Sequence, residues 1–569
     1  MLNNNRLIAN KFTVFFVSAL IAITFVFICG SFFTNYSFIL GHQVSLFASI
    51  ISPFIIAIVL SISIFKQHFY KIPVIVLGRK IANLDDRVIL AVLIFFIAAV
   101  FLSLSFIRHN SFSSNCDLAI YDQIVWNSAH GRFFNSSLMG DINSLGNHFE
   151  PILLFLAPLY WIFPGVIALF CVQSLALATA IIPLYLLSKR QLNNRFLVFV
   201  FIFLYLISRG IQGVATFDFH TDCFLPGLIF WAYYFIISGR MRGAAWMCLL
   251  MLLCKENAAI LVMGFGTFAF IKKETRIFGI ALIASGICAW LLVTKFIIPF
   301  FSRSQGDYQY YYWLPFGATL WDNCVFLFSH PIRLVMYFFD KEKLEYYLHI
   351  FGPSGFLAFL SPAHLGLFMA PITVFVLASS GHAEFLNIGV QYSAHTVPVV
   401  MISAIGATAW LKNKMVFKFP DYERKIIAIL SLYLIFTGVM LYGKTSGNRL
   451  NKFIKAGKAL EAREVASILR KKIPVDASVS VTDNLSAHLS NRQKLYLLEN
   501  IELKKSNQEN ENISRQRYKS EYVAVLKSPF YSNFNLLLAE INAHGYHKIE
   551  QDHLGNLILF TRSVEKGRN

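Results

Sequence analysis

The chain has 569 residues, of which 56% are hydrophobic, 16% aromatic and only 14% charged. A soluble chain of this length would carry charge on about a quarter of its residues. The composition therefore excludes a string of soluble domains, a disordered chain and a disulfide-stapled scaffold. The net charge of +19 does not indicate nucleic-acid binding, because the basic residues form no stripe interleaved with aromatic ones. We expect an all-α polytopic membrane protein that binds no nucleic acid.

Apolar stretches of about 20 residues, the length that crosses a bilayer as a helix, recur along the chain. They lie at 12–34, 45–65, 88–107, 165–187, 196–213, 222–238, 277–300, 394–411 and 426–443. The stretch 243–271 is too long for one crossing and holds Lys255 and Glu256 near its middle, so we interpret it as a hairpin of two short helices. The stretch 346–379, broken at Pro362, is interpreted in the same way, which gives about 11–13 transmembrane helices.

Lys and Arg gather in alternate loops, which predicts the orientation of the chain because cytoplasmic loops are rich in these residues. The basic segments, predicted to be cytoplasmic together with the N-terminus, are 1–11, 66–87, 188–195, 239–242, 272–276 and 412–425. The loops predicted to be external are 108–150, 214–221, 301–345 and 380–393. The same alternation places 444–569 outside the cell membrane.

The segment 444–569 differs in composition from the rest. Its first stretch, Asn451–Lys472, has the pattern of an amphipathic helix. Strand-like runs follow at Ala477–Thr482, Leu495–Leu498, Tyr522–Leu526 and Leu557–Thr561. We therefore expect three parts: an additional transmembrane hairpin and linker at 1–87, a transmembrane domain at 88–443 and a small external α/β domain at 444–569.

The predicted external loop 108–150 holds the densest set of polar residues. Asp117 follows a predicted span almost directly and opens Asp117–His130, which we interpret as a helix lying on the membrane surface. Asp117 is either the N-cap of that helix or a catalytic acid or base. Asp122 lies on another helix face, so the two carboxylates need not act as a pair.

Four more polar residues lie in or beside the predicted external loops. They are His148, Glu150, Asp218 and His220. Imidazole and carboxylate groups ligate divalent cations such as Mg²⁺ and Mn²⁺, but the same groups also occur as hydrogen-bonded loop residues at a polar boundary. Both interpretations stay open, because these residues lack the spacing of a known metal motif.

Charged and polar side chains within the apolar stretches are candidates for substrate or phosphate binding, since each is costly to bury without a partner. Lys255 and Glu256 form either a self-neutralising ion pair or a phosphate-binding lysine positioned by Glu256. Arg209, near the external end of a span, either binds phosphate or extends to the interface. Tyr392 precedes His395, which opens a span from the external side and either bonds to the loop or lines a cavity.

Several runs of sequence resemble a known family when taken together. DLAIYDQIVWNSAHGRFFNSSL and NHFEPILLFLAPLYWIFP resemble the opening of the domain of unknown function 2079 family of prokaryotic membrane proteins. Later runs fit the same pattern in order, among them FDFHTDCFLPGLIFWAYYF, LLCKENAAILVMGFG, QYSAHTVPVV and VDASVSVTDNLSAHLSNRQKLYLLEN. The resemblance extends from about Phe106 to beyond Leu498, which is most of the chain.

This family resembles the GT-C glycosyltransferase superfamily, whose members place an acidic residue in the first large external loop and use polyprenyl-phosphate sugars as donors. Asp117 occupies the matching place, with Asp122 as the second choice, whereas a D-x-D metal motif is missing. The resemblance implies an enzyme of the cytoplasmic (inner) membrane of a prokaryote, surrounded by membrane lipids.

The implied reaction moves a sugar from a polyprenyl-phosphate donor to a cell-envelope glycan, lipid or protein acceptor on the external face. Asp117 would act as the general base, and the anomeric configuration would invert. The alternative is a non-enzymatic transporter or flippase of lipid-linked sugars. A transporter should have polar residues at mid-membrane depth along a route to both faces.

Overall fold

The computed structural model describes residues 85–140, 142–302, 316–317, 320–379, 383–442, 446–498, 518–527 and 534–562. The predicted spans 12–34 and 45–65 lie outside these ranges.

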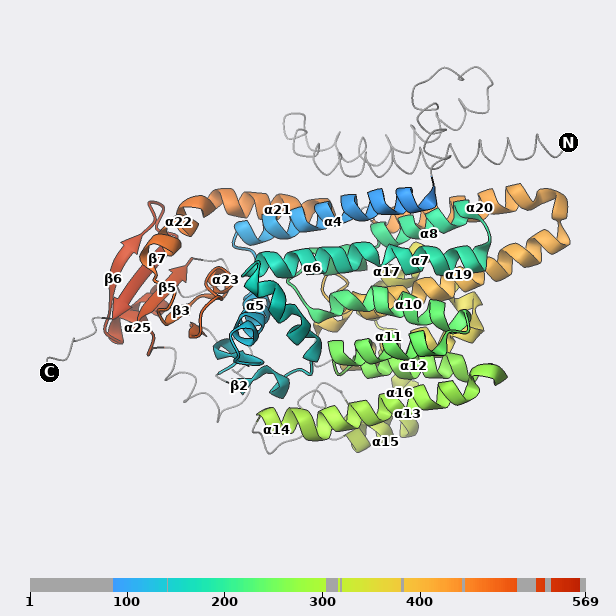
Figure 1. Ribbon diagram of the computed structural model, residues 1–569, viewed down its shortest axis with the longest axis horizontal. Coiled ribbons are helices and arrows are strands. Elements are labelled where there is room, and N and C mark those ends of the chain that lie inside the picture. The colour runs from blue at the N-terminus through green and yellow to red at the C-terminus, as the bar shows by residue number, and fades with distance from the viewer. Residues whose placement is uncertain are drawn as a thin grey trace, which may run out of the picture.

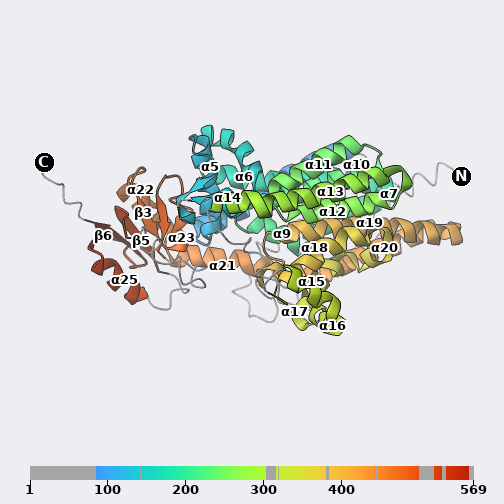
Figure 2. The same cartoon turned by 90° about the horizontal axis from the view of Figure 1, so that it is seen from below.

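Most of the molecule is a bundle of apolar helices that run along its longest axis (Figure 1). The helices of this bundle are α4 (Asp86–Asn110), α6 (Val166–Thr179), α7 (Ile181–Leu192), α8 (Arg195–Ile207), α9 (Arg209–Thr216), α10 (Leu225–Ile237), α11 (Met241–Cys254), α12 (Ala258–Phe270), α13 (Arg276–Leu292), α14 (Ile298–Ser302), α18 (Leu365–Ala378), α19 (Ser393–Lys418) and α20 (Glu423–Tyr442). Three further helices, α15 (Leu320–Ser329), α16 (Pro331–Phe338) and α17 (Lys341–Phe351), lie against one side of it (Figure 2).

Within the described residues, four helical segments are long and apolar enough to cross a membrane. They are Asp86–Asn110, Val166–Leu192, Lys273–Ser302 and Ser393–Lys418. The pair α8 and α9, bent by 47° at its break, is a fifth if it forms one crossing. Apolar helices of 10–17 residues, α10, α11 and α12 among them, occupy other predicted spans. The protein is therefore a multi-pass membrane protein in which long spans are combined with shorter and broken ones.

The two predicted hairpins have different outcomes. The stretch 243–271 folds as α11 and α12, with Lys255 and Glu256 at the turn between them, as predicted. The stretch 346–379 is not a two-helix hairpin, because only its second half forms an apolar helix, α18. Its first half contains the end of α17 and three 3₁₀ turns, Gly352–Ser354, Leu357–Leu360 and Pro362–His364. Two prolines and a left-handed glycine in these turns prevent a continuous helix.

Small residues let α12 and α13 pack with their backbones in close approach. A Cβ added at Gly279 would lie 2.5 Å from the backbone nitrogen of Phe270 and 2.7 Å from the carbonyl oxygen of Gly266. Small residues serve this purpose in membrane helix pairs, where association depends on close packing. Any larger side chain at Gly279 would force the two helices apart.

Helix α5 (Cys116–Ala129) lies at one end of the bundle, between the bundle and the C-terminal sheet (Figures 1 and 2). We call this end of the bundle the sheet end. The predicted helix at Asp117–His130 is thus confirmed, but most of its residues are buried, so it is not a helix with one face on a surface. The two-stranded sheet of β1 (Asn135–Ser136) and β2 (Ile142–Asn143) follows it. The next segment, Pro151–Trp161, is a 3₁₀ helix containing Pro158.

The C-terminal region holds a five-stranded sheet in the order β4-β3-β5-β7-β6. The strands are β3 (Val479–Val481), β4 (Leu495–Leu497), β5 (Tyr522–Leu526), β6 (Tyr546–Gln551) and β7 (Leu557–Arg562), and the helices are α21 (Ser446–Ala459), α22 (Ala462–Lys472), α23 (Asp483–Ser486) and α25 (Phe534–Ala543). Strand β3 pairs in parallel with β4 and β5, whereas β7 is antiparallel to β5 and β6. The predicted α/β composition is confirmed.

Two local predictions in this region are corrected. Strand β6 was not predicted, because most of its side chains are exposed and its sequence, YHKIEQ, lacks an apolar alternation. The predicted helix Asn451–Lys472 is two helices, α21 and α22, which are separated near Glu461. This residue has a left-handed backbone with φ +46°, which a continuous α-helix cannot contain.

Candidate active site

Asp117 lies in the first turn of α5 and presents its carboxylate at the surface. Asn115, not Asp117, is the N-cap residue, so the predicted N-cap role of Asp117 is wrong. The side chain of Asp117 is 41% exposed, and its Oδ2 lies 3.6 Å from Nε2 of His220. His220 Nδ1 lies 3.0 Å from the carbonyl oxygen of Asp218.

Asp218 is held from two sides beneath this pair. Arg108 Nη2 donates to Asp218 Oδ2 at 3.1 Å, and the Asn115 N–H donates to the same oxygen at 2.9 Å. Burial raises the pKa of the Asp218 carboxyl, although the Arg108 charge opposes that effect. Asp218 Oδ1 has no hydrogen-bond partner among the described residues. The carboxylate thus retains one buried oxygen with the capacity to bind a ligand.

Lys255 is the buried cation of the site. Its Nζ lies 3.5 Å from Asp222 Oδ2 and 4.0 Å from Glu150 Oε1, and its side chain is only 4% exposed. Asp222 Oδ1 lies 2.5 Å from Nε2 of His395. Because two carboxylates surround one ammonium group, the lysine charge is balanced inside the protein.

Glu150 connects the lysine to helix α5. Its Oε1 accepts hydrogen bonds from the Tyr121 hydroxyl and from the Thr221 hydroxyl, each at 2.8 Å. The Tyr121 ring lies edge-on to the His220 ring, with centroids 5.0 Å apart. A continuous chain of contacts therefore runs from the exposed Asp117 to the buried Lys255.

Three more predicted residues join this group. Glu256 Oε1 lies 2.9 Å from Nδ1 of His148, and its Oε2 accepts the Phe149 N–H at 3.0 Å. Tyr392 interacts electrostatically with Lys255 and with the acidic residues around it. The two charged residues at the α11–α12 turn thus contact different partners: Glu256 contacts His148 and Phe149, and Lys255 contacts Glu150 and Asp222.

Two predicted residues lie apart from this group. Asp122 is fully buried, and its two oxygens accept hydrogen bonds from Tyr160 and Ser490, each at 2.6 Å. Arg209 begins α9 and interacts electrostatically with His349 on α17. Asp122 is therefore a contact between α5 and its neighbours, and we do not retain it as a catalytic candidate.

The predicted metal ligands do not form one compact set. His148 and Glu150 bond to the separate partners given above, while Asp218 and His220 lie near Asp117. Within the described ranges, the acidic and histidine side chains whose ligand atoms all lie within 4.8 Å of one another are Glu461, Glu464 and His553, in the C-terminal region. A divalent cation at the sheet end would thus need a different set from the predicted one.

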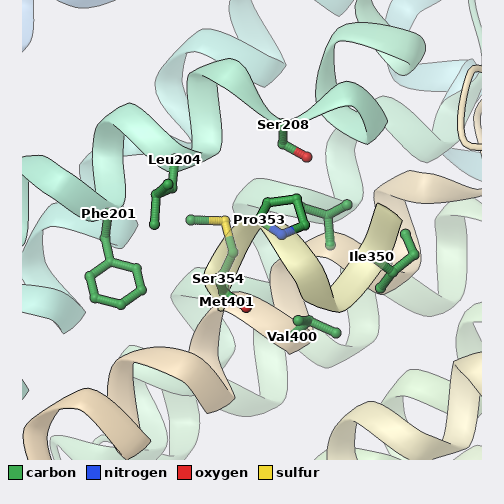
Figure 3. Close-up of a pocket in the computed structure, with 9 residues that line it drawn as sticks. Phe201, Leu204, Ser208, Ile350, Pro353, Ser354, Val400 and Met401 are labelled. Carbon is green, nitrogen blue, oxygen red and sulfur yellow. The ribbon is translucent and has the colours of Figure 1, made fainter. Parts of the chain in front are cut away.

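A small apolar cavity lies in the bundle, beside the start of α9 (Figure 3). It is lined by Phe201, Leu204, Ser208, Ile350, Pro353, Ser354, Val397, Val400 and Met401. Side chains of α8 and α19 face each other across it, and Ser208 directly precedes Arg209. Most of its lining residues are apolar, and Ser208 and Ser354 contribute polar atoms.

Sequence reasoning missed three residues of the site. Asp222 was counted within an apolar span, although a carboxylate at the first residue of a span is itself a signal of function. Arg108 was missed because an arginine in the last turn of a helix commonly donates to nearby backbone carbonyls. Its guanidinium does donate to the carbonyl oxygens of Ser113 and Thr216. Asp483 lies in the C-terminal region and contacts α5. The sequence around it gives no indication of this contact.

Fold and site together define a multi-pass helical membrane protein with a charged cluster at one end of the bundle, next to a small sheet. The chain belongs to the DUF2079 family of predicted membrane proteins, whose model matches residues 108–553. The family resemblance found in the sequence is therefore confirmed. No curated protein matches the chain in sequence.

Among solved structures, the chain is similar to ArnT from Cupriavidus metallidurans. The structure of ArnT bound to undecaprenyl phosphate has 12% identity and a TM-score of 0.49, and the match covers 83% of this chain and 98% of that one. The apo structure of the same protein has 13% identity and a TM-score of 0.42, with 81% and 97% covered.

Proposed function

We propose that the protein is a GT-C-type glycosyltransferase that moves a sugar from a polyprenyl-phosphate donor to an acceptor on the external face of the inner membrane. One observation carries the proposal: the half-exposed carboxylate of Asp117 lies at the open end of a chain of contacts, through His220, Tyr121 and Glu150, that leads inward to Lys255. A solvent-accessible carboxylate next to a buried cluster of charges is typical of a catalytic site.

In the proposed reaction, Asp117 is the general base. It takes the proton of an acceptor hydroxyl while that oxygen attacks the anomeric carbon of the donor sugar. The bond between the anomeric carbon and the lipid phosphate oxygen breaks at the same time, and the phosphate leaves with the electron pair. Because attack and departure occur on opposite faces, the anomeric configuration inverts. His220, 3.6 Å from the base, orients its carboxylate.

The leaving phosphate needs positive charge nearby, and the site is rich in acid. The site holds two cationic side chains, Arg108 and Lys255. Its carboxylates are those of Asp117, Glu150, Asp218, Asp222 and Glu256. We therefore include a divalent cation, Mg²⁺ or Mn²⁺, in the proposal. Asp218, with its unpartnered buried Oδ1, and His220 offer oxygen and nitrogen ligands of suitable chemistry. Such an ion would neutralise the donor phosphate, and chelation with EDTA followed by Mn²⁺ addition tests for it.

The sheet end is external in this proposal, which places the C-terminal region in the periplasm, where it presents the acceptor or closes the site. The isoprenoid chain of the donor enters between the membrane-spanning helices in this proposal. Membrane lipids surround the remaining bundle.

The test is transfer of a labelled sugar from a polyprenyl phosphate by the purified full-length protein in lipid nanodiscs. We expect Asp117→Asn to lower kcat by about 100-fold or more, while Asp421→Asn, a matched change at an exposed site, keeps the wild-type rate. A folded Asp117→Asn protein with normal kcat would refute the assignment of the base. Passage of lipid-linked sugar across a bilayer without any transferred product would instead favour the flippase.

A further inference from the structure

The first turn of α5 is capped by a residue that is distant in the sequence. The first N–H groups of a helix have no partner within it, and the side chain of Asn115 makes no cap hydrogen bond. The Cys116 N–H instead donates to Asp483 Oδ1 at 2.5 Å. The C-terminal region therefore supplies a hydrogen-bond acceptor one residue before Asp117.

Asp483 stands at a well-ordered point of the C-terminal sheet. It begins α23, directly beyond the carboxyl end of β3, a strand whose residues are all buried. β3 is flanked on both sides by the parallel strands β4 and β5. The preceding residue, Thr482, accepts the Leu526 N–H through its hydroxyl at 3.0 Å. The backbone that carries the Asp483 carboxylate is thus held from both sides.

Cys116, Asp117 and Asp218 are among the charged and titratable groups near Asp483 in the described part of the chain. Burial raises the pKa of the Asp483 carboxyl, and the charges of Asp117 and Asp218 add to this, while the bonds from Cys116 oppose it. Burial and the neighbouring carboxylates raise the pKa of the Cys116 thiol well above its ordinary range. Cys116 therefore keeps its proton and acts toward Asp483 as a donor only.

Other contacts hold the C-terminal region against α5 without Asp483. The Ser490 hydroxyl donates to Asp122, Gln123 donates to the Arg492 carbonyl at 2.9 Å, and the Leu495 N–H donates to the Ser137 hydroxyl at 2.8 Å. Replacing Asp483 should thus leave the two parts docked. Its effect on the first turn of α5 can be separated from docking.

We propose that Asp483 is a positioning residue of the candidate active site, whose carboxylate fixes the first turn of α5 and with it the side chain of Asp117. The inference rests on the proposed transferase function, because Asp483 acts through Asp117. It makes the site a joint product of the membrane bundle and the C-terminal region.

The experiment uses the full-length protein in nanodiscs and three variants. Asp483→Ala removes the acceptor, Asp483→Asn keeps an acceptor oxygen without the charge, and Glu540→Gln is a control on the exposed face of α25. Hydrogen exchange of the peptide that spans Cys116 and Asp117 is the first readout and does not depend on activity. We expect faster exchange in Asp483→Ala and near-normal exchange in Asp483→Asn and Glu540→Gln.

The second readout is steady-state transfer. We expect Asp483→Ala to lower kcat by about 10- to 100-fold with an unchanged donor KM, because misplacing a catalytic group affects the transition state more than binding. Asp483→Asn should recover part of this loss. If Asp483→Ala does not fold, Asp483→Ser, whose shorter side chain moves its oxygen away from Cys116, replaces it.

The outcomes separate the two proposals. Wild-type exchange at the first turn of α5 in Asp483→Ala overturns the positioning role, and so does faster exchange with a wild-type kcat. If the wild-type protein transfers no sugar from any polyprenyl-phosphate donor, the proposed function fails. The exchange data would in that case still decide whether Asp483 holds the first turn of α5.

Discussion

The first turn of α5 and its middle each carry a carboxylate, but the two environments differ. Asp117 is 41% exposed and faces His220 across 3.6 Å. Asp122 is fully buried, and each of its oxygens accepts a hydrogen bond, one from the Tyr160 hydroxyl and one from the Ser490 hydroxyl. Because Asp122 is fully buried, an acceptor hydroxyl cannot reach its carboxylate. The comparison therefore assigns chemistry to the first turn of α5 and attachment of neighbouring elements to its middle.

The same substitution at both positions tests this comparison with the largest expected effect. Asp117→Asn should lower kcat for sugar transfer by about 10²- to 10⁴-fold, the usual contribution of a general base, with little change in melting temperature because the side chain is half exposed. Asp122→Asn should keep kcat within a few-fold of wild type. Transfer assays and thermal unfolding of both variants in the same detergent measure the contrast, and a larger loss of kcat in Asp122→Asn would reverse it.

Removing the Asp122 carboxylate altogether tests the attachment role. In Asp122→Ala, the buried hydroxyls of Tyr160 and Ser490 lose their acceptor, and each unsatisfied group costs about 1–2 kcal/mol. We expect the free energy of unfolding at pH 5 to fall by about 2–4 kcal/mol, while the folded protein keeps the wild-type kcat. Stability equal to that of wild type would show that water or another group replaces the carboxylate.

Much of the bundle could be predicted from the sequence because the length of an apolar run is a local property. The turn between α11 and α12 was predicted from the charged pair Lys255 and Glu256 within such a run. The outcome was poorer at 346–379, where prolines and a left-handed glycine divide the chain into short 3₁₀ turns. Strand β6 was missed because its exposed, polar sequence carries no periodic signal.

The candidate site was predictable only in part. Asp117, His220 and Lys255 could be singled out because polar residues in an apolar chain are costly to bury without a partner. Which of them meet could not be derived, since that depends on how loops and helix ends pack. Asp483 is the extreme case, because 367 residues separate it from the Cys116 N–H that it accepts. A single sequence holds no signal for such a contact.

The pH dependence of stability gives a further test of the buried carboxylate. Burial raises the pKa of Asp122 from 3.8 to about 6, although the Tyr160 and Ser490 hydrogen bonds oppose this. The folded protein therefore binds this proton more tightly than the unfolded chain. The protonated Asp122 carboxyl contributes fully to the free energy of unfolding below pH 4. This contribution is lost as the pH rises through 6, a change of about 2–3 kcal/mol.

Asp122→Asn has no such proton, so its stability should vary less between pH 4 and 7 than that of wild type. Thermal unfolding at several pH values in one detergent measures both curves, and Asp421→Asn serves as the control for an exposed carboxylate. Parallel curves for wild type and Asp122→Asn would show that Asp122 does not titrate in this range.

The smallest effect concerns one hydrogen bond between the C-terminal region and the middle of α5. Ser490 donates to Asp122 Oδ2 at 2.6 Å, a short bond to a group that ionises within the physiological range. Ser490→Ala should cost about 1 kcal/mol, whereas Ser285→Ala, whose hydroxyl bonds to its own helix at the Leu282 carbonyl, should cost less. In a double-mutant cycle with Asp122→Asn, we expect a coupling free energy of about 1 kcal/mol. A coupling of zero would mean that this bond contributes nothing to docking, and the attachment of the C-terminal region to the middle of α5 would then rest on other contacts, such as that of Gln123 with the Arg492 carbonyl.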